Sequence, residues 1–132
     1  MTADVAIQTF WAKALENLES ARSELTGRRH NASANRAYYA VFHAAIVGLL
    51  REGIQPQGMQ WAHAFVQAQF AGQLVTRRKV YAAEFRDTLP RLEELRERAD
   101  YGLSHVSQTQ AHRALRRAQE FIEAIECKGG QA

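Results

Sequence analysis

The chain has 132 residues, 46% of them apolar and 23% charged, a balance typical of one globular domain that buries its own core. Its formal net charge of +3 is mild for a nucleic-acid binder, and its lone cysteine, Cys127, excludes an internal disulfide and favours a reducing, cytoplasmic compartment. No stretch of the sequence predicts a membrane span. We therefore expect a single domain over residues 1–132, and a composition rich in alanine, leucine and arginine favours helix almost throughout.

The first predicted helix covers residues 3–25, where apolar residues recur three and four positions apart. Gly27 stands where a C-terminal cap belongs. The basic turn Arg28-Arg29-His30 follows. Its simpler interpretation is a solvated loop, and the other is a phosphate contact.

The central stretch, residues 35–50, is apolar on nearly every side, which predicts a helix in the middle of a bundle. Asn31 or Ser33 is expected to cap it. Arg36 and His43 are seven residues apart, within about 20° of two full turns, so they share one face of this helix.

Three further helices are expected. Residues 60–72 form the third, after a loop at 54–58 that contains Pro56. A fourth begins at the basic residues 77–79 and restarts at Asp87 or Thr88, because Pro90 interrupts it. It closes around residues 100–102. The sequence from Ser107 to Gln110 is typical of a capping box and opens a last helix that runs to about residue 127.

Several kinds of active site are missing from the sequence. It has no glycine-rich phosphate loop, no paired cysteines and no His-Glu-x-x-His. The five histidines lie at spacings that make no metal set. We therefore expect neither a metal ion nor a cofactor.

Two arginine–histidine pairs remain, each with six intervening residues: Arg36 with His43, and Arg98 with His105. The second pair spans a predicted helix break and is the better candidate, since loops present groups to a substrate. In the simpler interpretation Arg98 forms an ion pair with Glu94 and His105 is an ordinary loop residue. Arg36 is then a buried arginine held by Asp100 or by a backbone carbonyl.

Four segments occur in an order that is informative together: Asn35-Arg-Ala-Tyr-Tyr-Ala-Val-Phe-His-Ala-Ala45, His63, Arg96-Glu-Arg-Ala-Asp-Tyr-Gly102 and Ala118-Gln-Glu-Phe-Ile-Glu-Ala-Ile125. They closely resemble the small all-helical prokaryotic HEPN domain proteins, over nearly the whole chain. The resemblance implies an all-α, up-and-down bundle of four long helices plus a short one. It also implies a two-fold homodimer.

The resemblance extends to activity. Many HEPN proteins are metal-independent ribonucleases that carry an arginine, four to six residues, and then a histidine. They often act as the toxin beside a minimal nucleotidyltransferase antitoxin. By this likeness Arg98 and His105 take the catalytic positions, with Asp100 and Tyr101 beside them.

In that assignment His105 exchanges a proton with the RNA and Arg98 stabilises charge on the phosphorus. The second-choice residues are Arg36, His43 and Arg96, and Arg96 is the arginine that best fits the Arg-x-x-Ala-Asp-Tyr pattern.

The alternative function is a non-catalytic, dimeric interaction or nucleotide-binding module. In that case Arg36 joins Asp100 and Tyr101 in a structural network. An Arg98 side chain folded onto Glu94 would favour this alternative.

Overall fold

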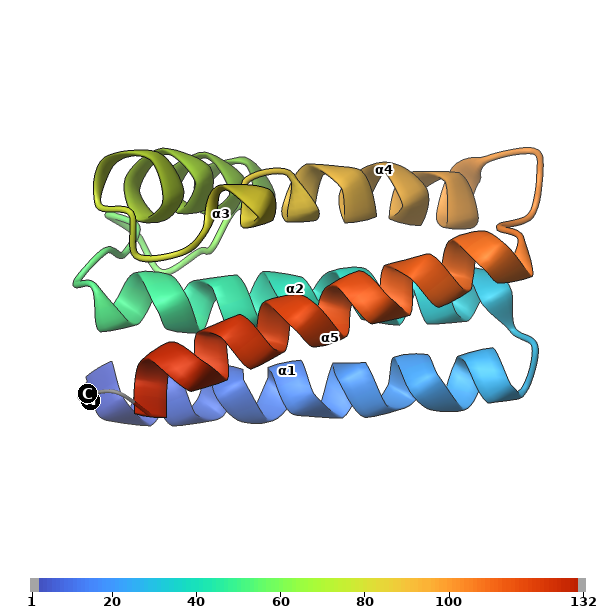
Figure 1. Cartoon of the computed structure of the whole chain (residues 1–132), viewed down its shortest axis with the longest axis horizontal. Helices are drawn as coiled ribbons and strands as arrows, with labels where there is room; N and C mark the ends of the chain where they lie inside the picture. The colour runs from blue at the N-terminus through green and yellow to red at the C-terminus, as the bar shows by residue number, and fades with distance from the viewer. Residues whose placement is uncertain (1–2, 131–132) are drawn as a thin grey trace.

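The computed structural model describes residues 3–130, and these residues form a packed helical bundle without strands. Helices α1 (Ala3–Thr26) and α2 (His30–Arg51) run antiparallel, and α5 (Gln108–Gly130) crosses them diagonally (Figure 1). Helix α4 (Thr88–Tyr101) lies along the other side of α2. The all-α bundle predicted from the sequence is confirmed.

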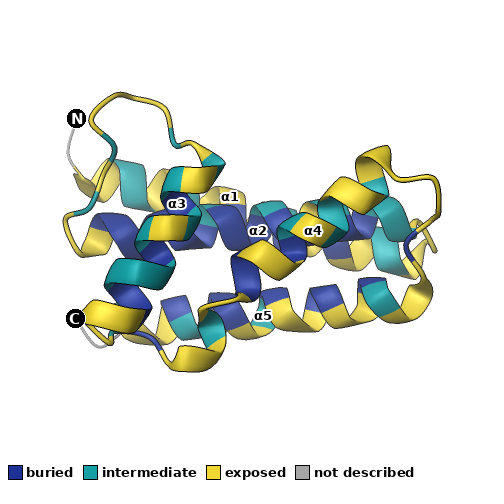
Figure 2. Cartoon of the chain, turned by 90° about the horizontal axis from the view of Figure 1, so that it is seen from above, coloured by how far each residue is buried: buried dark blue, intermediate teal, exposed yellow. Residues whose placement is uncertain are grey.

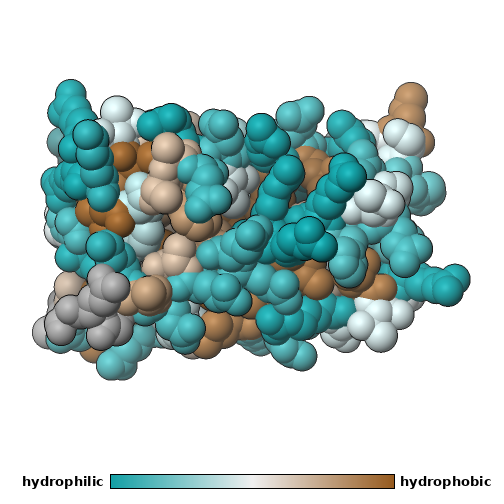
Figure 3. All heavy atoms as spheres, in the orientation of Figure 1, coloured by the Kyte–Doolittle hydropathy of each residue, from teal (hydrophilic) through white to brown (hydrophobic). Residues whose placement is uncertain are grey.

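Helix α2 lies at the centre, as its apolar pattern predicts. It contacts α1, α4, α5 and α3, and the dark ribbon in Figure 2 shows how far it is buried. Tyr38, Ile46 and Leu49 on this helix are completely buried. Helix α5 lies at the surface of the bundle, and its outer face carries mostly hydrophilic side chains in Figure 3.

Helix α1 ends in a Schellman motif: the N–H of Arg29 donates to the Glu24 carbonyl (2.8 Å), and that of Arg28 donates to Leu25 (3.0 Å). The residue in the left-handed region is Arg28, with a φ of 62°, so the prediction of Gly27 for this position is wrong by one residue. A Cβ at Gly27 would first meet the Arg29 guanidinium, the end of an exposed and flexible side chain that can move aside.

The expected cap of α2 is also wrong. The helix begins at His30, and its N-cap residue, Arg29, makes no side-chain capping bond. Ser33 is buried and its hydroxyl donates to the Ala21 carbonyl of α1 (2.8 Å). The Asn31 oxygen accepts the backbone N–H of Val106 (2.9 Å), far along the chain. Ser33 thus joins α2 to α1, and Asn31 joins α2 to the loop before α5, so neither side chain caps α2.

The third helix begins and ends later than predicted. Helix α3 (His63–Gln69) continues directly into a π-helical segment, η1 (Phe70–Arg77). The fourth helix therefore cannot begin at residues 77–79. Lys79 adopts a φ of 53° there, and a short 3₁₀ turn, η2 (Ala83–Phe85), precedes α4.

Helix α4 starts at Thr88 with Asp87 at the N-cap, which confirms the restart before Pro90. Pro90 is tolerated because the first turn of a helix has no N–H partners to lose. The capping box is confirmed as well: Ser107 N–H donates to Gln110 Oε1 (2.9 Å), and Gln110 N–H donates to Ser107 Oγ (3.1 Å). Over residues 3–130 no helix has the length and apolar character of a membrane span.

Candidate functional site

Three polar side chains on α2 lie along one line that faces other elements. Asn31, Asn35 and Tyr38 are spaced by four and then three residues, which places them on one face of the helix. Each makes hydrogen bonds to residues more than 20 positions away in the sequence. We call this line the α2 polar line.

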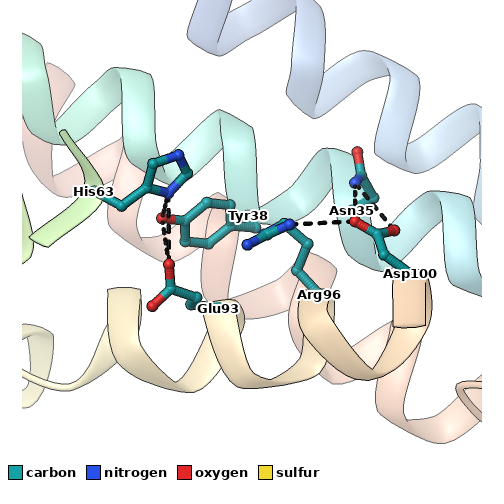
Figure 4. A network of polar contacts seen from close by, with 6 residues as sticks. All are labelled: Asn35, Tyr38, His63, Glu93, Arg96 and Asp100. Carbon is teal, nitrogen blue, oxygen red and sulfur yellow. Dashed lines mark hydrogen bonds and ion pairs between the residues drawn. The ribbon is translucent and has the colours of Figure 1, made fainter. Parts of the chain in front are cut away.

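The Tyr38 hydroxyl is the centre of a compact cluster at one end of the α2 polar line (Figure 4). Its oxygen lies 2.6 Å from His63 Nδ1 and 3.4 Å from Glu93 Oε2. The amide of Gln67 donates to the same oxygen at 3.5 Å. The ring of Tyr38 is buried, whereas the side chains of His63 and Glu93 are 39% and 25% exposed, so the cluster reaches the surface.

The donors and acceptors decide which nitrogen of His63 carries the proton. The Glu93 carboxylate only accepts, so the Tyr38 hydroxyl donates to it. The Tyr38 oxygen then accepts from the Gln67 amide and from His63 Nδ1–H. Nε2 of His63 keeps its lone pair and has no hydrogen-bond partner among the described residues. Burial raises the pKa of Tyr38 well above its usual range, so the hydroxyl keeps its proton.

The middle of the α2 polar line holds Asp100 and Arg96. Asn35 Nδ2 donates to both carboxylate oxygens of Asp100 (3.3 and 3.1 Å), and Arg96 Nη1 donates to Oδ2 (3.2 Å). The Arg96 guanidinium carbon lies 5.2 Å from the Tyr38 ring centroid and 5.8 Å from that of Tyr39. Arg96 is 13% exposed, and its Nε is buried without a hydrogen bond. Its charge is therefore fixed beside the Tyr38 cluster.

No hydrogen bond or ion pair joins the first-choice residues Arg98 and His105 in the part of the chain that the structure describes. Arg98 lies 4.0 Å from Glu94 and lines a hollow of about 240 Å³ between α4 and α5. His105 lines a different hollow, of about 440 Å³, and its Nδ1 lies 3.0 Å from Asn31 Nδ2. Tyr101 is 81% exposed at the end of α4.

Arg36 and His43 do share a face, as their spacing predicts, but it is the face toward α1. Asn17 lies between them: its oxygen accepts from Arg36 Nη1 (3.3 Å), and its amide nitrogen lies 3.4 Å from His43 Nδ1. Arg36 is exposed, so the expectation of a buried arginine held by Asp100 is wrong. Arg96 and Asn35 hold that carboxylate. Burial, and then the charge of Lys13, lower the pKa of His43.

The sequence interpretation missed Tyr38, His63 and Glu93 as site residues, and His63 entered only as part of the family resemblance. The signal for Tyr38 was the spacing of Asn31, Asn35 and Tyr38 on one helix, whereas no local signal singles out Glu93 among the glutamates of α4. Within residues 3–130 there is no group of three histidine, cysteine or acidic side chains that could hold a metal ion.

Comparison with protein families and with curated proteins adds one match. The model described as the HEPN domain matches residues 7–128, which is most of the chain. No curated protein matches it.

Proposed function

Since this chain belongs to the HEPN domain family, we propose that it cleaves RNA without a metal ion and that His63 is the general base. The observation that supports this proposal is the orientation of the imidazole by Tyr38 and Glu93. Their hydrogen bonds place the proton on Nδ1 and leave Nε2 as an acceptor on a partly exposed ring. Histidine suits this task because its charge changes near neutral pH.

In the proposed reaction the RNA 2′-hydroxyl attacks the adjacent phosphorus, and its proton moves to His63 Nε2. The bond between phosphorus and the 5′-oxygen breaks, and the leaving oxygen takes a proton from water. The products are a 2′,3′-cyclic phosphate and a 5′-hydroxyl. The Glu93 carboxylate stabilises the positive charge that forms on His63, both through the Tyr38 hydroxyl and directly, because Glu93 Oε2 lies 3.5 Å from His63 Nδ1.

Arg96 takes the role of the arginine in this proposal, in place of Arg98. It is held beside Tyr38 by Asp100 and by the faces of two tyrosine rings, so its position is fixed before a substrate binds. Arg98, by contrast, faces Glu94 in a hollow that His105 does not line.

The test is cleavage of a structured RNA pool in EDTA by the wild type and by three histidine variants. His63→Ala should abolish cleavage, and His112→Ala, at an exposed site on α5, should leave it unchanged. His105→Ala is the decisive comparison. If it alone abolishes turnover while His63→Ala cleaves normally, the proposed base is wrong. An inactive wild-type protein refutes the proposed reaction.

We further propose that the protein is the toxin-like half of a pair, a homodimer that binds a nucleotidyltransferase antitoxin. Membership in the HEPN family supports this proposal. Sedimentation of the purified chain should give twice the mass of the monomer, and co-expression with an adjacent nucleotidyltransferase should give a stable complex. A monomer that binds no such partner contradicts it.

A second candidate function is a non-catalytic interaction module, and one observation favours it. Arg98 lies against Glu94, at 4.0 Å, which is the arrangement expected if this arginine has no catalytic role. This candidate predicts RNA or partner binding without cleavage, so the same EDTA assay separates it from the ribonuclease.

A further inference from the structure

The hollow that His105 lines lies at the end of the bundle away from His63, between the α1–α2 turn and the α4–α5 loop. Its volume is about 440 Å³, and Arg28, Arg29, His30, Asn31 and His105 are among the residues that line it. No acidic side chain lines it. Its polar lining is thus positively charged or neutral, and Ala32 and Val106 add an apolar part.

Hydrogen bonds fix the ring of His105 in the opposite tautomer from His63. The backbone N–H of Val106 can only donate, so the Asn31 side chain presents its oxygen to it (2.9 Å). The Asn31 Nδ2 group therefore faces His105 and donates to Nδ1 (3.0 Å). A neutral ring whose Nδ1 accepts carries its proton on Nε2. The free nitrogen of His105 is a donor.

Arg28 supplies positive charge that no described residue neutralises. Its side chain is exposed and makes no hydrogen bond or ion pair with the residues that the structure describes. It also occupies the left-handed position of the Schellman motif, with a φ of 62°, where glycine is strongly favoured. Because this backbone conformation is strained for an arginine, its presence there points to a role for the Arg28 side chain.

The start of α2 adds backbone donors to the same hollow. The helix has no side-chain cap, and residues 30–32 of its first turn line the hollow. Arg29 also lines the hollow, but its Nε donates to Glu24 (3.0 Å), so one of the two arginine charges is already paired. The Nε2 atom of His30 is buried there without a hydrogen-bond partner.

We propose that this hollow binds a phosphoryl group, which accepts hydrogen bonds from His105 Nε2–H and Arg28 and faces the start of α2. A tetrahedral oxyanion suits this hollow, because His105 Nε2–H, the Arg28 guanidinium and the first N–H groups of α2 can all donate to it and no carboxylate lines the hollow. In RNA this would be a different phosphate from the one cleaved at His63. Asn31 and Tyr38 are seven residues apart on α2, a rise of about 10 Å. Only this assignment to RNA depends on the proposed function.

Inorganic phosphate is the first probe, followed by NMR of ¹⁵N-labelled protein. Phosphate should shift the His105 Nε2–H signal and the backbone N–H signals of residues 30–32. His105→Ala and Arg28→Gln should each weaken binding about tenfold, the loss expected for one hydrogen bond to a charged group. His112→Ala and Arg116→Gln are matched controls on α5 outside the hollow, and should bind as the wild type does. A His105 signal that carries its proton on Nδ1, or phosphate shifts that all four variants retain, would overturn the proposal.

RNA oligonucleotides with a 5′-phosphate or a 5′-hydroxyl identify the source of the phosphoryl group. A preference for the 5′-phosphate that Arg28→Gln removes assigns the hollow to a chain end, and equal affinity with the same loss assigns it to an internal phosphodiester. The two proposals fail separately. His63→Ala should lose cleavage and still bind phosphate, and an uncleaved RNA pool leaves the phosphate shifts as an independent result.

Discussion

Replacing Arg28 with glycine should stabilise the protein and weaken phosphate binding at the same time. An L-residue in the left-handed region costs about 1–2 kcal/mol, which glycine avoids. Glycine also gains freedom in the unfolded chain, which offsets about 0.5–1 kcal/mol of that gain. Because the Arg28 side chain makes no hydrogen bond or ion pair with a described residue that would be lost, the net gain in unfolding free energy is about 0.5–1 kcal/mol.

Thermal unfolding followed by far-UV circular dichroism measures this gain. For a chain of this size the unfolding entropy is about 0.28 kcal/mol/K, so Tm should rise by about 2–4 °C. Lys79→Gly is the matched control, since Lys79 has a φ of 53° and lies outside the phosphate hollow. It should raise Tm similarly and leave phosphate binding unchanged. A lower Tm for Arg28→Gly alongside a higher one for Lys79→Gly would show that the Arg28 side chain stabilises the turn, and would refute the reasoning.

Three other outcomes are expected. Tyr38→Phe should reduce kcat with little change in KM, because the hydroxyl orients His63 without touching the substrate. An unchanged kcat would show that the Tyr38 hydroxyl does not orient His63 for catalysis. Arg96→Ala should cost about 2 kcal/mol of unfolding free energy, whereas Arg36→Ala, at an exposed site, should change it by less than about 0.5 kcal/mol; equal losses in denaturant titrations would contradict this contrast. Burial lowers the pKa of folded His43, so below about pH 6.5 the unfolded ring takes up a proton first and stability falls. His43→Gln should reduce that fall in Tm, and an identical pH profile in the variant would exclude His43 as its source.

Some features of this protein depend on residues only a few positions apart, and these could be predicted. The capping box at Ser107 is such a case, because both of its hydrogen bonds join residues three apart. The restart of α4 before Pro90 follows from the covalent geometry of proline. The central place of α2 follows from its apolar residues on every side, since no other position in a bundle buries all of them.

The partners of the polar side chains on α2 were decided by packing. Asn31 was predicted to be a cap, yet it bonds to a histidine 74 residues away and to a backbone N–H 75 residues away. Arg36 looked buried because its helix is, but the α1 side of α2 leaves it exposed.

Helix packing also decided the arrangement of the candidate site. Tyr38, His63 and Glu93 come from three helices, and their hydrogen bonds exist only once α3 and α4 lie against α2. Arg98 and His105 are close in sequence, and the turn between them directs one toward Glu94 and the other toward Asn31. Helix periodicity and capping act within one or two turns of chain, so they are readable from the sequence. The direction in which a side chain meets a distant partner depends on how whole helices pack, and no short stretch of sequence contains that information.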